Sequence, residues 1–161
     1  MLPLLGGACG LLSSKKPVLP TKPPGSSWAL VEGTHDGSLL LARVRTQLGE
    51  IVRHSAYPFR VGVATPLRQL AGNGIPTPEE NATLLEVEDR LAEILEADRA
   101  AVHVITLTTN GVKEWVFYAS DPKTMKQRMG TLAPTVNTHR LQMVVERDAD
   151  WEVYHQFLKA Q

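Results

Sequence analysis

The chain has almost no cysteine, no long apolar run and no excess of either charge. Its 161 residues include one cysteine, Cys9, which excludes an intramolecular disulfide and leaves the core to hold by packing alone. No apolar run approaches the roughly 20 residues of a bilayer-spanning helix. The net charge is zero at neutral pH, which argues against nucleic-acid binding driven by bulk charge.

Signatures of metal, cofactor and covalent chemistry are missing as well. The five histidines lie in separate segments, and no two of them have the spacing of a structural metal site. Gly72 and Gly74 precede Thr77 and Pro78 without the third glycine of a dinucleotide-binding loop, so they predict a turn before a capped helix. No serine lies in a Gly-x-Ser-x-Gly turn. The sequence therefore predicts no metal, no cofactor and no catalytic residue.

What is present fits one globular domain. A content of 43% hydrophobic and 21% charged residues is ordinary, and 161 residues suffice to bury a core. The zero net charge hides an asymmetry, because residues 1–70 hold eight Lys and Arg against three Asp and Glu, and residues 71–161 hold nine against fourteen. A locally basic surface is therefore compatible with the sequence.

The first 27 residues differ in composition from the rest. Residues 1–12 are apolar and small, and residues 13–27 are rich in Pro, Lys, Ser and Gly, which is typical of a solvated linker. We therefore divide the chain into an apolar head with its linker (residues 1–27) and one α+β domain (residues 28–161). Cys9 follows three small residues, a pattern that resembles the end of a bacterial lipoprotein signal, although the usual leucine and basic leader are missing.

Two interpretations of this head remain open. In the first, which the pattern slightly favours, Cys9 is lipidated and tethers the domain to the bacterial envelope, its only expected contact with a membrane. In the second, the head is a frayed tail of a cytoplasmic protein, and its cysteine is incidental.

Strand signals recur along the domain. Residues 28–34 and 39–46 are strand-like and flank Asp36-Gly37, a hairpin signal. Residues 59–64 alternate in the period of a half-buried strand, and residues 101–108 and 112–119 flank a second hairpin signal, Asn110-Gly111. Residues 140–146 form the last expected strand. The domain therefore contains two predicted hairpins and two further strands.

Three helices are expected between and after these strands. The first begins with Thr77 as cap, Pro78 in the first turn and Glu80 completing a capping box, and runs to about residue 97. The second follows Asp121, and the third is a short helix, capped by Asp148 or Asp150, that buries residues 151, 154 and 158. From residue 59 onward the order is strand, helix, strand, strand, helix, strand, which is the ferredoxin-like split βαβ arrangement.

The predicted fold class is therefore α+β, a ferredoxin-like split βαβ unit with an extra N-terminal β-hairpin. The sheet should be mostly antiparallel. The helices should lie on one face, because right-handed crossovers place the helices beginning at Pro78 and Pro122 on the same side.

Several segments occur together in a characteristic order. They are residues 79–95, residues 102–108, Asn110-Gly111 followed by residues 114–118, and Asp150-Trp151 with Tyr154. Together with the strands of residues 28–46, they resemble the bacterial family called domain of unknown function six-nine-five over about residues 28–158. The resemblance implies an α+β fold and carries over no catalytic residue, since the family has no established activity. Related domains are likened to a ribonuclease-regulator family, which implies inhibition by protein contact.

Strand alternation predicts one working surface. If the aliphatic side chains of residues 40, 42 and 44 face the helices, the arginines between them lie on the open face of the sheet. The same alternation places Arg60 and Arg140 on the open face. Tyr118 joins them there if Trp115 and Phe117 occupy the core. The candidate binding residues of this open face are Arg43, Arg45, Arg60, Tyr118 and Arg140.

Such a face suits a small anionic ligand or the acidic surface of a protein partner, because guanidinium groups bind carboxylates and phosphates. The alternative is that the arginines pair with Glu32, Glu114 and Glu146 on neighbouring strands. RNA is disfavoured, since only one stacking aromatic is expected on that face. We therefore predict a non-enzymatic interaction or regulatory module; the alternative is a small, hydrolase-like enzyme whose site joins residues distant in sequence.

Overall fold

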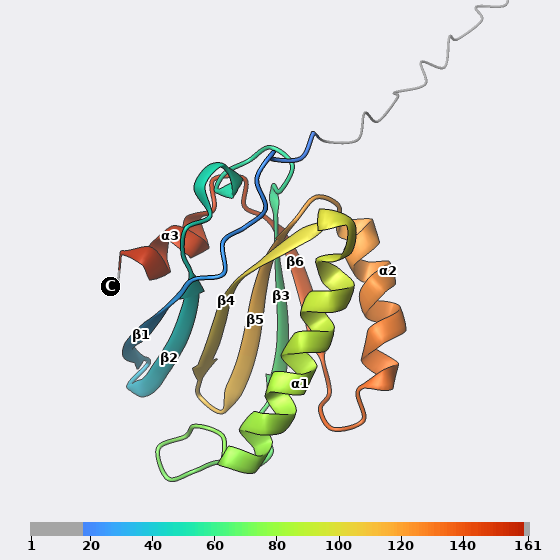
Figure 1. The fold of residues 1–161 in the computed structure, drawn as a ribbon. Helices are drawn as coiled ribbons and strands as arrows, with labels where there is room; N and C mark the ends of the chain where they lie inside the picture. Colours follow the sequence, from blue (N-terminus) through green and yellow to red (C-terminus); the bar gives the residue numbers. More distant parts are fainter. Residues whose placement is uncertain (1–17, 160–161) are drawn as a thin grey trace, which may run out of the picture.

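The structure is a computed structural model that describes residues 18–159 (Figure 1). One antiparallel sheet has the strand order β1-β2-β4-β5-β3-β6. Its strands are β1 (Trp28–His35), β2 (Ser38–Arg45), β3 (Phe59–Pro66), β4 (Ala101–Thr109), β5 (Val112–Ala119) and β6 (Gln142–Arg147). The helices are α1 (Pro78–Leu95), α2 (Pro122–Leu132) and α3 (Glu152–Leu158). The predicted α+β class, antiparallel sheet and element order are confirmed, whereas Cys9 lies outside the described residues.

Both hairpins turn where the sequence predicts. Asp36 and Gly37 have φ values of 48° and 79°, and Asn110 and Gly111 have φ values of 51° and 72°. Two successive residues with positive φ make the tight turn that matches the twist of paired strands, and Asn, Asp and Gly tolerate it best.

The start of α1 confirms one half of the predicted capping box and corrects the other. Thr77 caps the helix, because its Oγ1 accepts a hydrogen bond from the Glu80 amide at 3.3 Å. The carboxylate of Glu80 does not return to the Thr77 amide, which donates to the Gln69 carbonyl. It accepts instead from the amides of Arg68 and Gln69, at 2.6 and 2.5 Å. Glu80 therefore fastens the preceding loop to the helix.

Two hydrophobic cores lie on opposite faces of the sheet. The first packs α1 and α2 against Val61, Val63, Trp115 and Phe117, so the prediction that these two helices share a face is confirmed. The second core includes Val116 and Tyr118 together with Ala42, Val44, Trp151 and Tyr154. The expectation of helices on one face only is therefore wrong, since α3 covers part of the other face. The cause is β5, whose side chains are apolar at both parities.

The C-terminal helix is attached at the point where this second core ends. The carboxylate of Asp148 accepts from the amides of Glu152 and Val153, at 2.8 and 3.3 Å, as the predicted cap requires. Trp151 donates from its Nε1 to the Tyr57 carbonyl at 3.0 Å. These contacts fix α3 against the sheet, with Trp151 fully buried.

The end of the segment expected as a linker lies against the domain. The carboxylate of Glu50 accepts from Thr21 Oγ1 at 2.8 Å and from the Lys22 amide at 3.0 Å. Arg45 donates from Nε to the Gly25 carbonyl at 2.6 Å. Residues 21–25 therefore take part in packing.

Candidate functional site

In Figure 1, β1 and β2 lie to one side of α1. A groove of about 1010 Å³ lies between these strands and α1, on the α1 side of the sheet. Strands β4 and β5 form its floor, α1 forms one wall, and the β1–β2 hairpin forms the other. The residues of these strands and of α1 that line it include Leu30, Glu32, Leu41, Arg43, Leu85, Thr108 and Lys113.

The loop between β3 and α1 contributes a further wall. Leu70 and Pro76 form an isolated antiparallel bridge, and the Ala71 amide donates to the Ile75 carbonyl at 2.8 Å. Gly74 turns the chain with a φ of 79°, which glycine adopts without strain. The closed loop presents Ala71, Ile75 and Pro76 to the groove.

Lys113 lies in the floor of the groove with 8% of its surface exposed. Among the described residues its ammonium has no ion pair and no side-chain hydrogen bond. Burial lowers the pKa of this amine; the charge of Glu88 opposes the shift and that of Arg43 adds to it. A buried cation without a partner is unfavourable, so this position requires an explanation.

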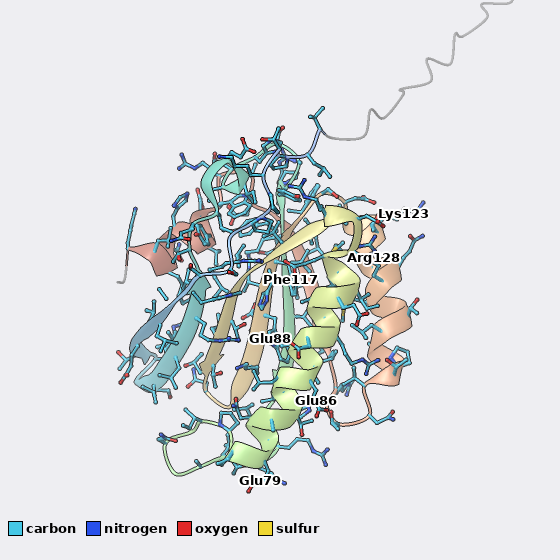
Figure 2. The ribbon with its side chains drawn as sticks, in the orientation of Figure 1. Glu79, Glu86, Glu88, Phe117, Lys123 and Arg128 are labelled. Carbon is cyan, nitrogen blue, oxygen red and sulfur yellow. The ribbon has the colours of Figure 1, made fainter. Side chains whose placement is uncertain are left out.

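Glu88 connects α1 with three strands beside the groove. Its carboxylate accepts from Arg43 Nη2 on β2, from Thr106 Oγ1 on β4 at 3.1 Å and from Trp115 Nε1 on β5 at 2.8 Å. Burial raises the pKa of this carboxyl, but the bond from Arg43 and the nearby positive charges outweigh it, and the pKa is lowered. Figure 2 shows Glu88 on the side of α1 next to the sheet, whereas Glu86 is exposed.

His103 is a buried residue of β4. Its ring stacks on Phe117 at 4.7 Å and tilts against Trp28 at 5.1 Å. Burial lowers its pKa to about 4, so the ring is neutral at pH 7. Nε2 lies 3.1 Å from the Ile105 carbonyl and 3.0 Å from Thr106 Oγ1, which places the ring proton on Nε2. The ring therefore cannot take a proton from the Thr106 hydroxyl, and this contact lacks the geometry of an activated nucleophile.

The structure reverses the predicted orientation of Arg43 and Arg45. Both point to the α1 side, where their guanidinium groups lie 5.4 and 5.7 Å from the centroid of the Trp28 ring. Arg45 also donates to Glu96, the residue that follows α1, at 3.2 Å. The prediction is wrong because the aliphatic side chains of β2 pack into the second core, on the α3 side.

The other predicted binding residues do not join them. Arg60 lies on the α3 side and pairs with Glu146, the partner expected under the alternative interpretation. Tyr118 is fully buried; it stacks on Trp151 at 3.9 Å and donates to Asp148 at 2.6 Å. Arg140 is exposed and precedes β6. The five residues therefore form no common surface.

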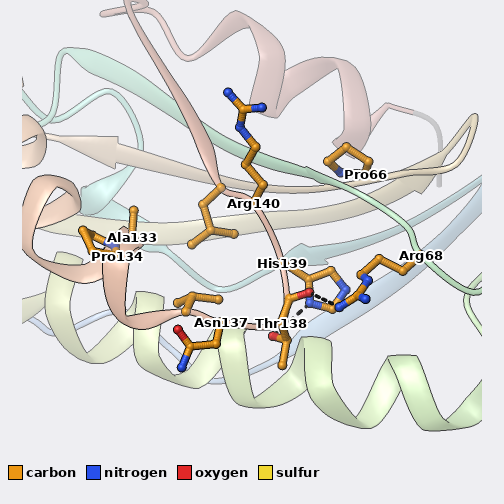
Figure 3. Close-up of a pocket in the computed structure, with 10 residues that line it drawn as sticks. Pro66, Arg68, Ala133, Pro134, Asn137, Thr138, His139 and Arg140 are labelled. Carbon is orange, nitrogen blue, oxygen red and sulfur yellow. Dashed lines mark hydrogen bonds between the residues drawn. The ribbon is translucent and has the colours of Figure 1, made fainter.

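Arg140 instead lines a shallow hollow of about 610 Å³ beside β3 (Figure 3). Arg68 donates there to the Thr138 carbonyl at 2.8 Å, and buried His139 contacts Glu80 at 2.8 Å. Burial raises the pKa of Glu80, but its hydrogen bonds from the Arg68 amide and His139 outweigh this and the pKa is lowered. The polar groups under this hollow are thus already paired within the fold.

Within residues 18–159, no cluster of histidine, cysteine and carboxylate side chains has the geometry to hold a metal ion. The helices of this part of the chain are too short or too polar to cross a membrane. No curated protein and no solved structure matches the chain. A family model does match it, over residues 26–159, and the chain accordingly belongs to the family of unknown function DUF695.

Proposed function

We propose that the domain is a non-enzymatic binding module whose groove takes a ligand with an apolar body and one anionic group. The observation that carries the proposal is Lys113, a buried cation that lines the groove and lacks a partner among the described residues. An anion bound beside it would supply the missing countercharge.

The charges around the groove favour the same ligand. Arg43 donates to Glu88 through its Nη2 alone. Its Nε and Nη1 have no hydrogen-bond partner among residues 18–159. The carboxylate of Glu88 already accepts three hydrogen bonds. On the floor of the groove, Arg43 and Lys113 have only the carboxylate of Glu88 between them within the described part of the chain, whereas the carboxylate that lines the groove, exposed Glu32, lies on the β1 wall. An anionic group therefore fits beside Lys113 better than a neutral or cationic one.

The walls argue for an apolar body. Leu30 and Leu85 stand on opposite sides of the groove with 82% and 44% of their surfaces exposed. Ile75, Pro76 and Leu41 add further apolar surface. A concave site with apolar walls and few polar groups is typical of small-molecule binding, in which burial of the body provides affinity and the charge provides orientation.

Calorimetric titration with 4-phenylbutyrate and with its neutral analogue, 4-phenylbutanol, tests the proposal. The acid should bind at least about tenfold more tightly, a difference of about 1.4 kcal/mol. Lys113→Met should abolish this preference, and Lys126→Met, which changes an exposed lysine of α2, should retain it. Equal binding of acid and alcohol, or an unchanged preference in Lys113→Met, would contradict the proposal.

We also infer that the scaffold under the groove is a ferredoxin-like unit. Strands β3 to β6 stand in the order β4-β5-β3-β6, and α1 joins β3 to β4 across the one strand between them. That order supports a split βαβ arrangement, to which β1 and β2 add an extension at the β4 edge. A crystal structure with a different strand order would contradict it.

A further inference from the structure

The amine of Lys113 differs chemically from those of the exposed lysines. Lys22, Lys123, Lys126 and Lys159 lie at the surface, whereas Lys113 is nine-tenths buried and opens onto the groove. Burial lowers the pKa of Lys113, so a larger share of it is the uncharged, nucleophilic amine at neutral pH.

We propose that Lys113 binds its ligand covalently and reversibly, as an imine formed with the carbonyl group of an oxo acid. The inference rests on the proposed function, because an oxo acid is one kind of anionic ligand that the groove would take. The carboxylate would meet Arg43, and the carbonyl carbon would meet Nζ of Lys113. The apolar walls would contact the body of the acid on either side of the imine.

The positions of Arg43 and Lys113 set the shape of this ligand. Arg43 lies on β2 and Lys113 on β5, with β4 between them. In register Arg43 is level with Trp115, two residues from Lys113, so the two backbones are about 12 Å apart at the usual strand and residue spacings. Both side chains stand on the α1 side and line the groove. An acid whose carboxylate and carbonyl are at opposite ends of the molecule fits this separation better than one with the two groups on adjacent carbons.

The reaction balances without an oxidant or reductant. The lone pair of Nζ forms a bond to the carbonyl carbon, and the carbonyl oxygen takes up a proton as its π bond breaks. Nitrogen supplies that first proton and then its second, so the hydroxyl leaves as water as the nitrogen lone pair forms the carbon–nitrogen double bond. The hydroxyl of Thr108 lies on the strand paired with Lys113, opposite it in register, and also lines the groove. It is placed to hydrogen-bond the departing oxygen.

Borohydride reduction tests the inference, because it converts an imine into a stable secondary amine. The full-length protein is incubated at neutral pH with 4-carboxybenzaldehyde, reduced and mapped by mass spectrometry. We expect one modification, at Lys113, formed at least about tenfold faster than with benzaldehyde, which lacks the carboxylate, or with glyoxylate, whose two groups are adjacent. Modification of the exposed lysines at the same rate as Lys113 would overturn the inference.

A matched pair of variants separates this inference from the proposed function. Lys113→Arg keeps the positive charge and cannot form an imine under these conditions, whereas Lys113→Met loses both. We expect Lys113→Arg to bind 4-phenylbutyrate and to remain unmodified by the aldehyde. Binding of 4-phenylbutyrate by the wild type with no trapped imine at Lys113 would refute imine formation alone. Loss of that binding preference in the wild type would refute both.

Discussion

Replacing Lys113 with methionine should make the free domain more stable. Methionine has a similar unbranched side chain, so it can fill the same space without the ammonium group. Lys113 is 8% exposed and has no partner among the described residues. Its Nζ opens onto the groove and keeps part of its hydration, so we take the cost as that of an unsatisfied polar group, about 1–3 kcal/mol, and not as the larger cost of a fully buried charge. We therefore expect Lys113→Met to raise the free energy of unfolding by about 1–3 kcal/mol.

Urea denaturation followed by circular dichroism measures this gain, and thermal unfolding offers a second readout. For a domain of this size, a change of 1 kcal/mol moves Tm by about 2–4 °C, so the midpoint should rise by about 2–12 °C. Lys126→Met, at an exposed position of α2, should change the unfolding free energy by no more than about 0.5 kcal/mol.

The stability that Lys113→Met gains over the wild type should fall as the pH rises. The pKa of Lys113 is lowered from 10.5 in the folded state, so the unfolded chain holds this proton more tightly than the fold does. The wild type therefore gains stability as the pH rises from its folded pKa towards 10.5, and the advantage of Lys113→Met shrinks over that range. A variant that is less stable than the wild type at pH 7 would refute the reasoning, because it would mean that the ammonium is well solvated or paired.

Three further predictions concern the groove and its surroundings. Glu88→Gln should lower the unfolding free energy by about 2–3 kcal/mol, since Arg43 loses its charged partner and the bond from Trp115 weakens; urea denaturation measures it. The lowered pKa of Glu80 adds stability above pH 4.5 that is lost as the pH falls through the folded pKa, so urea midpoints should fall less between pH 7 and pH 3 in Glu80→Gln than in the wild type. Arg60→Ala should leave the calorimetric affinity for 4-phenylbutyrate unchanged, since Arg60 lies on the other face of the sheet.

Local signals predicted the elements well because the chemistry that ends an element is itself local. Asp36-Gly37 and Asn110-Gly111 adopt the positive φ values that their turns need. Thr77 caps α1 as its position before Pro78 indicates. The side-chain partner of Glu80 could not be predicted in the same way, because it lies in a loop whose approach to α1 depends on tertiary packing.

The face of each strand was less predictable. Strand β2 has aliphatic side chains at both parities, so its own sequence allows either orientation. The choice follows from the second core, and that core depends on α3, which is far away in the chain. Lys113, by contrast, could have been found: it is two residues before Trp115 and four before Phe117, and strand alternation places all three on one face.

Glu88 was missed for a related reason. The carboxylates of α1 are explained by a solvated helix face, and most of them are exposed. Glu88, however, follows Leu84 by four residues and precedes Leu91 by three, so it borders the buried stripe of the helix. Whether such a residue meets water or a strand depends on how far the sheet extends beside the helix, which its local sequence does not specify.

The position of β5 between two cores has a consequence for how the domain opens. Trp115 and Phe117 belong to the core under α1 and α2, and Val116 and Tyr118 belong to the core that includes α3. Loss of either core alone would leave β5 packed on its remaining side and paired with both β3 and β4. Amide hydrogen exchange in β5 should therefore require global unfolding, while β1 and α3 exchange through smaller, independent openings.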